Sequence, residues 1–354
     1  MGTLDPSVAA IRTAVRDALR ATPVPAGKPL ALVACSGGAD SLALAAATGF
    51  VAPRLGWRAG LLTVDHRLQP DSAAQAGAVA EWAGKAGFDP VQVLPVTVPA
   101  GRRSGGPEAA ARTARYQALA GAAGRLGAAA VLLGHTRDDQ AETVLLALAR
   151  GAGPRGLAGM PARRDRDGVA WLRPLLGTGR AQTGAACRAQ RLEPWQDPHN
   201  RDPAYARARV RATALPALVE ALGERVVDNL ARTAAQLAAD TAALDALAAA
   251  ALTAARTADG GLAVGALQEL PDAVRTRVLH AWARELGAGG SALSHRHVAV
   301  LDALVTGWHG QGPVHLPGGI QVSRLGTALL ADPTATGGGR PTPPRPATGG
   351  PIPG

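Results

Sequence analysis

The chain has 354 residues, a formal net charge of +10 and 47% hydrophobic residues, which is typical of a globular protein with two domains. Its two cysteines, Cys35 and Cys187, exclude a disulfide framework and a four-cysteine metal site, and they fit a reducing cytoplasm. The sequence has no secretory signal and no uncharged apolar run of about 18 residues, so we expect a cytoplasmic protein without a membrane partner.

The positive charge has two explanations. A protein that neutralises nucleic-acid phosphates releases counterions, so a strongly basic chain often binds DNA or RNA. However, nearly all of the positive charge is arginine, with lysine only at Lys28 and Lys85, and alanine, glycine and proline are also abundant. GC-rich codon usage would produce the same composition. Charge alone does not decide between the two.

The first half of the chain alternates between strand and helix patterns. Apolar spacing predicts an N-terminal helix over residues 7–20. Strands are then predicted at 30–35, 60–64, 91–98 and 128–134, with helices from Leu42 onward and at 72–87, 107–126 and 138–150. This alternation predicts an α/β fold with a doubly wound parallel sheet, whose ligands bind beyond the carboxyl ends of the strands.

The second half has a different pattern. Leucines keep a helical spacing across 226–247, further helices are predicted at 267–286 and 294–306, and short strands at 313–331 could form a hairpin at Gly318-Gly319. We therefore expect a smaller, mainly helical domain after the sheet domain. The predicted parts are an N-terminal helix and lead-in (1–26), the α/β domain (27–215), the helical domain (216–332) and a disordered Pro/Gly-rich tail (333–354).

The most informative motif is Ser36-Gly37-Gly38-Ala39-Asp40-Ser41, between the first strand and its helix. Two glycines let backbone amides converge on an anion, and the amides and dipole of the helix start also favour phosphate. Ser36 and Ser41 add hydroxyl donors. Asp40 would repel a phosphate unless Mg²⁺ lay between them, so we assign Asp40 to the metal. The alternative is a tight turn without a ligand, and the motif lacks the lysine of a Walker A loop.

A second set of polar side chains is expected at the same edge of the sheet. His135 follows the fourth strand, and Asp138, Asp139 and Gln140 open the next helix, facing the loop. His135 either contacts substrate or is a buried core histidine. Asp138 either acts in the site or complements the helix dipole, and Asp139 either acts in the site or caps the helix.

Four other regions have equally open interpretations. Asp65 ends the second strand and either contacts substrate or caps a turn, and Glu142 faces either a cleft or solvent. Arg150 could simply complement the negative end of its helix. A basic cluster surrounds Tyr205 and either contacts RNA phosphates without reading bases or forms a solvated helix face. Its arginines are Arg201, Arg207, Arg209 and Arg211.

The loop at 36–41 resembles the PP-loop of the N-type ATP pyrophosphatases, which cleave ATP to AMP and pyrophosphate. Further segments are similar to the tRNA(Ile)-lysidine synthetase family in its short form, although Arg67 stands where that family usually has glycine. These segments are Thr63-Val-Asp-His-Arg-Leu68, Glu108-Ala-Ala-Ala-Arg-Thr-Ala-Arg-Tyr116, Gly134-His-Thr-Arg-Asp-Asp-Gln-Ala-Glu-Thr143, Arg173-Pro-Leu-Leu176 and the basic segment 195–211.

The resemblance implies an adenine nucleotide alpha hydrolase-like fold and an enzyme that uses ATP and Mg²⁺. It would adenylate the wobble cytidine in the CAU anticodon of an isoleucine tRNA and join free L-lysine to carbon 2, forming lysidine. A homodimer is one option for its assembly. The residues implied are Asp40, His135, Asp138 and Arg150 for catalysis; 36–41, Val64 and Gly134 for ATP; Asp65, His66, Arg115, Asp139, Gln140 and Glu142 for lysine or cytidine; and Arg201, Tyr205, Arg207, Arg209 and Arg211 for tRNA.

Several alternatives remain at this point. A tRNA thiolase of the same superfamily commonly uses clustered cysteines, and a small-molecule ligase would need no basic tRNA surface. A non-catalytic nucleotide-binding module would bind ATP without releasing pyrophosphate. The attacking lysine amine must also lose a proton, and the sequence leaves the acceptor open between Asp138 and His135.

Overall fold

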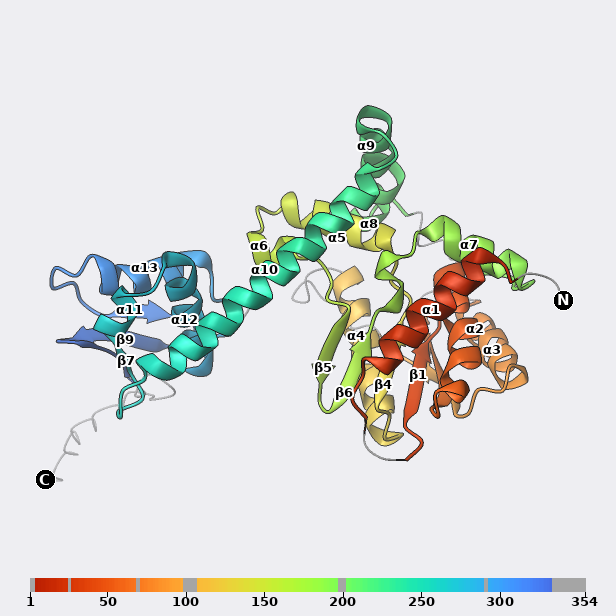
Figure 1. Ribbon diagram of the computed structural model, residues 1–354, viewed down its shortest axis with the longest axis horizontal. Helices are drawn as coiled ribbons and strands as arrows, with labels where there is room; N and C mark the ends of the chain where they lie inside the picture. Colours follow the sequence, from red (N-terminus) through yellow and green to blue (C-terminus); the bar gives the residue numbers. More distant parts are fainter. Residues whose placement is uncertain are drawn as a thin grey trace, which may run out of the picture. The chain divides into compact units, whose positions relative to one another are not determined.

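The computed structural model describes residues 4–24, 27–67, 71–97, 107–196, 202–289 and 292–332, and it divides the chain into two compact units, Met1–Ala238 and Ala239–Gly354 (Figure 1). Each unit has its own β-sheet. The predicted tail at 333–354 lies outside the described residues, as do Arg201 and the end of the 63–68 segment. The first unit continues to Ala238, beyond residue 215 where we placed a boundary.

The first unit contains a six-stranded sheet with the order β3-β2-β1-β4-β6-β5. All neighbouring strands are parallel except β5, which runs antiparallel at the edge. Four strands were predicted from their apolar runs, whereas β5 consists of four exposed, charged residues and gives no such signal. The strands are β1 (Leu30–Ala34), β2 (Arg58–Asp65), β3 (Val91–Pro95), β4 (Ala130–Leu133), β5 (Arg163–Arg166) and β6 (Val169–Leu172).

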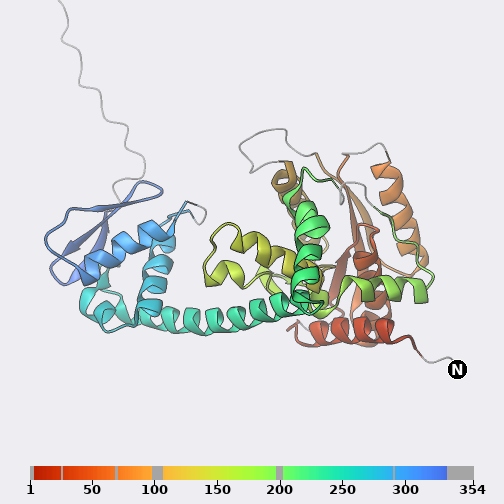
Figure 2. The same ribbon diagram turned by 90° about the horizontal axis from the view of Figure 1, so that it is seen from above.

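Helices cover both faces of this sheet, as the doubly wound prediction requires (Figure 2). Alternate residues of β1 point to opposite faces. Ala31 and Val33 belong to a core built with α1 (Pro6–Arg20), α2 (Ala39–Arg54), α3 (Ser72–Lys85) and α7 (Arg180–Ala189). Leu30 and Leu32 belong to a second core built with α4 (Pro107–Arg125). Burial on both faces explains why β1 is apolar throughout.

Several short elements complete the first unit. The helix α5 (Arg137–Leu148) follows β4, and a one-turn helix, α6 (Pro154–Leu157), and a 3₁₀ turn at Pro174–Gly177 lie farther along the chain. The helix α8 (Ala206–Arg209) continues through a π-helical turn at Val210–Ala214 into α9 (Leu215–Leu222). Pro216 lacks an amide donor and crowds the preceding turn, which is consistent with the wider turn just before it.

The second unit packs helices against a four-stranded antiparallel sheet of order β7-β10-β9-β8. The predicted hairpin is confirmed, with Gly318 and Gly319 at φ +89° and +75° between two strands. The predicted helix at 267–286 is interrupted by Pro271. The elements are α11 (Val264–Gln268), α12 (Asp272–Glu285), α13 (His295–Thr306), β7 (Leu262–Ala263), β8 (Val314–Leu316), β9 (Ile320–Leu325) and β10 (Ala328–Asp332).

The helix α10 (Val226–Ala255) runs across the boundary between the units. Within the described part of the chain, it is the one helix whose length and composition would allow it to span a bilayer. Its last turns instead contribute Ala248, Leu252 and Ala255 to the core of the second unit. The absence of a membrane partner therefore stays a prediction.

Candidate active site at the carboxyl ends of β1 and β4

The loop at 36–41 leaves β1 and opens α2, and its shape depends on a glycine and two serines. Gly37 has φ +86°, and a Cβ there would lie 2.5 Å from the Gln75 amide nitrogen and 2.9 Å from a Val79 methyl group. The Ser41 hydroxyl donates to the Gly38 carbonyl (3.0 Å) and accepts from the Ser36 amide (3.2 Å). The two serines therefore hold the loop in shape.

Gly134 brings the fourth strand against this loop. A Cβ at this position would lie 3.1 Å from both the amide nitrogen and the Cα of Ser41, so a side chain would push the loop away. The residues that follow Gly134 therefore start beside the loop. Val64, the third predicted nucleotide contact, is half-buried on β2, which pairs with β1 on its other side.

Two helix N-termini meet at this edge of the sheet and differ in how their amides are satisfied. Gly38 caps α2 in an extended conformation, without a side-chain cap. In α5, the Asp139 Oδ2 atom accepts from the Thr136 amide (2.8 Å), and the Thr136 hydroxyl accepts from the Asp139 amide (3.4 Å). Asp139 therefore is a helix cap, as one alternative held. The first amides of α2 are the ones left to bind a phosphate.

Asp138 has a similar role toward a third helix. Its Oδ2 atom accepts from the backbone amide of Arg180, the first residue of α7, at 2.8 Å. Asp138 is only half-buried, so a group in the site can still reach it. Neither of the two alternatives for Asp138 included this contact, because nothing in the sequence places α7 beside α5.

Arg180 connects the acidic residues of the site. Its guanidinium lies 2.7 Å from Asp139 Oδ1, 3.2 Å from Glu142 Oε1 and 3.6 Å from Asp40 Oδ2. Burial acts to lower the pKa of Arg180, but the charges of these carboxylates raise it above its ordinary value. No sequence motif marked this residue. The need for a cation among several acids was the only available signal.

Glu142 faces neither an open cleft nor solvent. Its side chain is 0% exposed, and Arg211 binds it through two contacts of 2.8 and 3.1 Å. Arg207 lies 3.7 Å away and also donates to the Thr143 hydroxyl. A buried carboxylate is tolerated only when cations and hydrogen bonds compensate it. Arg207 and Arg211 therefore act as half-buried cationic partners of the buried Glu142 in this structure.

The predicted basic cluster is thus split. Arg207 and Arg211 turn inward, whereas Arg209 is exposed and donates to the carbonyls of Pro203 (2.7 Å) and Ala204 (2.9 Å). The half-buried Tyr205 caps the start of α8 through its backbone carbonyl, which accepts from the Arg209 amide. The interpretation as a uniformly solvated helix face is therefore wrong for Arg207 and Arg211.

Asp40 was assigned to Mg²⁺, and its surroundings fit a carboxylate that shares a cation with bound phosphates. Burial raises the pKa of Asp40, while the hydroxyl of Thr183, which donates to it, and the Arg180 charge act in the opposite direction. Among the residues that the structure describes, no group of three His, Cys, Asp or Glu side chains could hold a metal alone. Mg²⁺ commonly binds through one or two carboxylates plus substrate phosphates, so this donor set suits it.

Asp65 forms the turn after β2. It accepts from the Ser72 hydroxyl (2.7 Å) and the Arg67 amide (2.9 Å), and the Ser72 bond is the main cause of its lowered pKa. Arg67 has φ +52°, a left-handed conformation that glycine adopts most readily. Asp65 is therefore a turn cap, and His66 lies half-buried in the same turn.

His135 and Arg115 lie in a half-buried, basic part of the site. Burial lowers the pKa of His135 to about 3, with further lowering from the charges of Arg173 and Arg115 against an opposing effect of Asp139. Burial also lowers the pKa of Arg115, and Tyr116 and Arg112 are its neighbours. The Nδ1 atom of His135 is buried, and no hydrogen-bond partner is found for it in the described part of the chain.

Two predicted site residues, Gln140 and Arg150, have contacts or positions that the sequence did not indicate. Gln140 forms two hydrogen bonds with the backbone of Met160, at 3.0 and 2.7 Å, which dock the segment after α6 against α5. Both polar atoms of the Gln140 side chain are therefore engaged in this contact. Arg150 is exposed and follows the carboxyl end of α5, about 18 Å along the axis from Asp138. The structure does not bring Arg150 to the loop.

A cavity of about 570 Å³ adjoins the loop at Gly37. Trp82 and Trp195 are among its lining residues, together with Gly37. The Trp195 amide donates to the Gly37 carbonyl (2.9 Å), so the segment before the basic cluster holds the loop directly. The sequence placed Trp195 in a motif, but nothing in it indicated this contact.

The glycine-rich loop, the open start of α2 and the acids at the carboxyl edge of a parallel sheet define a PP-loop enzyme. The PP-loop domain family matches residues 11–218, and the TilS substrate binding domain matches 262–325. A tRNA(Ile)-lysidine synthase of Salinispora tropica is 67% identical over 95% of this chain and 99% of its own length. One of Streptomyces coelicolor is 51% identical over 92% of this chain and 98% of its own. The chain belongs to the tRNA(Ile)-lysidine synthase family.

The structural comparison agrees at the level of fold. The U34-tRNA thiolase NcsA from Methanococcus maripaludis, with its [4Fe-4S] cluster, superposes with a TM-score of 0.54 at 15% identity, over 66% of this chain and 80% of that one. A likeness at this identity shows the fold alone. The fold class and family predicted from the sequence are confirmed.

Proposed function

We propose that this chain is an ATP-dependent ligase that joins free L-lysine to carbon 2 of the wobble cytidine in the CAU anticodon of an isoleucine tRNA. Membership of the tRNA(Ile)-lysidine synthase family carries this proposal. The loop at the uncapped start of α2 supports the use of ATP, because its free amides suit a polyphosphate. Mg²⁺ as a cofactor, a cytoplasmic location and a homodimer belong to the same proposal.

The reaction has two steps in this proposal. The cytidine carbon-2 oxygen attacks the α-phosphorus of ATP, pyrophosphate leaves, and the oxygen becomes part of an adenylate. The deprotonated lysine amine then attacks carbon 2, the bond from carbon 2 to oxygen breaks, and AMP leaves with that oxygen. Activation is needed because the carbonyl oxygen of cytosine is a poor leaving group. The bound orientation of lysine and base supplies much of the acceleration.

The residues have distinct roles in the first step. The amides at the start of α2 and the hydroxyl groups of Ser36 and Ser41 would bind the triphosphate, and Asp40 would hold Mg²⁺. Mg²⁺, when bound, neutralises charge on the phosphates. Arg180 lies 3.6 Å from Asp40, so its charge also acts near the departing pyrophosphate. Gly134 keeps the carboxyl end of β4 close to the loop.

Asp139 is the candidate to bind the lysine ammonium group, because Glu142 is fully enclosed. Its Oδ1 atom already lies 2.7 Å from the Arg180 guanidinium and 3.3 Å from that of Arg211, so its surroundings suit a cationic ligand. A lysine ammonium group would replace one of these two arginines at Asp139 Oδ1. Asp138, rather than His135, would accept the proton of the amine, because its carboxylate is half-buried, so a group in the site can reach it, and its negative charge attracts the cationic amine.

A thiolase activity is not favoured. Cys35 and Cys187 are the two cysteines of the sequence, and both are buried behind the loop. Burial raises the pKa of both thiols, to about 11 for Cys187, so neither is a thiolate at neutral pH. Their contacts are structural: Cys187 Sγ lies 3.3 Å from the Ala39 carbonyl oxygen.

The proposal is tested by incubating the enzyme with ATP, labelled lysine and an isoleucine tRNA transcript with a CAU anticodon. Label should enter this RNA with release of AMP and pyrophosphate. A transcript that differs only by uridine at the wobble position is the control and should stay unlabelled. Label in a small acceptor instead would indicate another PP-loop ligase, and ATP binding without pyrophosphate release would indicate a non-catalytic module.

A further inference from the structure

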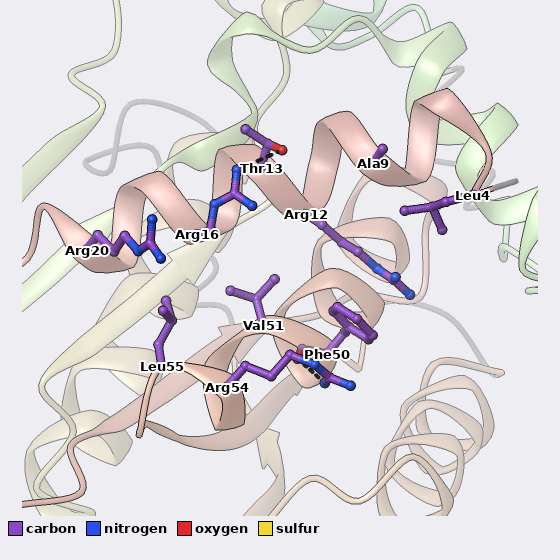
Figure 3. Close-up of a pocket in the computed structure, with 10 residues that line it drawn as sticks. All are labelled: Leu4, Ala9, Arg12, Thr13, Arg16, Arg20, Phe50, Val51, Arg54 and Leu55. Carbon is purple, nitrogen blue, oxygen red and sulfur yellow. Dashed lines mark hydrogen bonds between the residues drawn. The ribbon is translucent and has the colours of Figure 1, made fainter.

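A second cavity, of about 370 Å³, lies between α1 and the carboxyl-terminal part of α2 (Figure 3). The catalytic loop is at the other end of α2, and Arg54 lies about 21 Å along the helix axis from Asp40. This cavity is therefore separate from the active site. Its charged lining residues, within the described part of the chain, are Arg12, Arg16, Arg20 and Arg54, without a carboxylate among them.

The centre of this arginine pocket is Phe50. The Cζ atoms of Arg12 and Arg54 lie 3.5 and 3.6 Å from the centroid of its ring, and Figure 3 shows the ring between the two guanidinium groups. Cation–π attraction holds each guanidinium against the ring. It does not cancel the repulsion between two like charges at such short range. Arg54 is further fixed by donating to the Phe50 carbonyl (2.6 Å).

Arg12 has unused hydrogen-bonding capacity in this arrangement. Its Nε atom is buried, and no partner for it is found among the described residues. Burial and the charge of Arg54 both lower the pKa of Arg12, so the protonated guanidinium is held at a cost in free energy. An anion in the cavity would supply the missing acceptor and the missing negative charge.

The other two arginines extend the positive charge along α1. Arg12, Arg16 and Arg20 are spaced four residues apart, so they share one helix face, and like charges at this spacing repel one another. The Asp17 carboxylate lies 3.6 Å from Arg16, but both side chains are exposed and such a pair compensates little. Arg20 alone could be explained by the negative end of α1. The whole row is not explained in that way.

We propose that this pocket binds backbone phosphates of the tRNA, at a contact outside the active site; the inference rests on tRNA being the substrate. The row from Arg12 to Arg20 spans about 12 Å of helix, which suits successive phosphates of a strand better than one small anion. Both faces of Phe50 are covered by guanidinium groups, so no base can stack there. The contact therefore positions the RNA without reading its sequence.

The test uses the full-length enzyme with Arg16→Gln and Arg20→Gln together, because these two side chains do not contact Phe50 and can be changed without disturbing the fold. We expect the Kd for tRNA to rise about tenfold, and the magnitude of the slope of log K against log salt to fall by about 1.4 to 1.8, the value for two lost phosphate contacts. The kcat for lysine transfer at saturating tRNA should not change. A control variant, Lys85→Gln with Arg125→Gln, removes two charges elsewhere in the same unit and should bind tRNA normally.

Two more measurements test whether positive charge at Arg16 and Arg20 is required and whether the bound phosphate belongs to RNA or to a small anion. Arg16→Lys with Arg20→Lys should retain most of the affinity for tRNA. Calorimetric titration with inorganic pyrophosphate distinguishes a site for small anions from a site for RNA phosphates. If the Gln variant loses pyrophosphate binding but keeps the tRNA affinity and salt slope of the wild type, the inference is overturned. Equal tRNA binding by the Gln variant and the control would also overturn it. If neither wild type nor variants transfer lysine but the Gln variant still loses tRNA affinity, the proposed function fails and the pocket stands.

Discussion

The N-termini of α2 and α5 have similar positions in the fold, but they differ in whether side chains cap their first backbone amides. Each helix follows a buried parallel strand, β1 or β4, and each has an acid in its first turn. At α5 the amides are closed by Thr136 and Asp139, whereas at α2 the capping position is Gly38, which has no side chain to close them. The residue at the cap, rather than the acid that follows, determines which helix start can bind an anion.

The two helix starts also differ in how their acids are compensated. Asp139 and its neighbour Glu142 have guanidinium partners within 3 Å, whereas the Arg180 guanidinium is 3.6 Å from Asp40. The acids on α5 thus have strong partners before any ligand binds, and Asp40 has a weaker one. A cation that arrives with phosphates meets less competition at Asp40.

The largest effect is expected when Arg180, which lies near the acids of both helices, is replaced. Arg180→Gln would remove the cation beside Asp40 and one of the two arginines that contact the buried Asp139 and Glu142, which should lower the free energy of unfolding by about 3 kcal/mol. Urea unfolding followed by circular dichroism measures this. Arg188→Gln, an exposed change on the same helix, should have almost no effect. A loss below about 1 kcal/mol would show that the acids do not depend on Arg180.

The next prediction tests the function of Asp40, the first-turn acid of α2. Asp40→Asn should reduce pyrophosphate release by about 100- to 1,000-fold, as expected when charge stabilisation at the reacting phosphates is lost. The melting temperature should change little, because Asp40 caps no helix. Asp165→Asn, an exposed change on β5, is the control for both measurements. Turnover that survives in the Asp40 variant would remove the metal assignment.

His135, which lies just before α5, should make the stability of the protein depend on pH. His135 has a folded-state pKa of about 3, below the ordinary value of 6.5, so the unfolded chain binds the proton more readily. The histidine should therefore cost up to about 1.4 kcal/mol of stability per pH unit as the pH falls from 6.5 toward 3. His135→Asn removes this term, so its stability should fall less steeply than that of the wild type in acid. His295→Asn, at an exposed position, should follow the wild-type curve.

The smallest effect concerns the cap itself. Thr136→Ala removes the hydroxyl that accepts from the Asp139 amide and should lower the free energy of unfolding by about 1 kcal/mol. Thermal unfolding monitored by calorimetry is sufficient. The matched control is Thr253→Ala on an exposed face of α10. Equal losses in the two variants would mean that the α5 start is not closed in the way described.

The sequence was sufficient for elements whose signals are local. Continuous apolar runs predicted β1 to β4, and the glycines of the PP-loop predicted the open helix start, whereas the short buried strand β6 was missed. It was not sufficient where the deciding contact joins distant segments. Arg180 meets acids that lie far apart in the chain, and β5 is exposed and charged, so neither has a local pattern. The inward orientation of Arg207 and Arg211 depends on Glu142, which lies on another helix.

The order of these residues along the chain has a consequence for synthesis on the ribosome. All four carboxylates, Asp40, Asp138, Asp139 and Glu142, are translated before any of the three arginines that compensate them, and Glu142 waits 69 residues for Arg211. Until then, the nascent domain has acids that must stay in water. The PP-loop unit therefore completes its folding only after the segment through residue 211 has left the exit tunnel, and a product that ends before Arg180 lacks the cations that close the site.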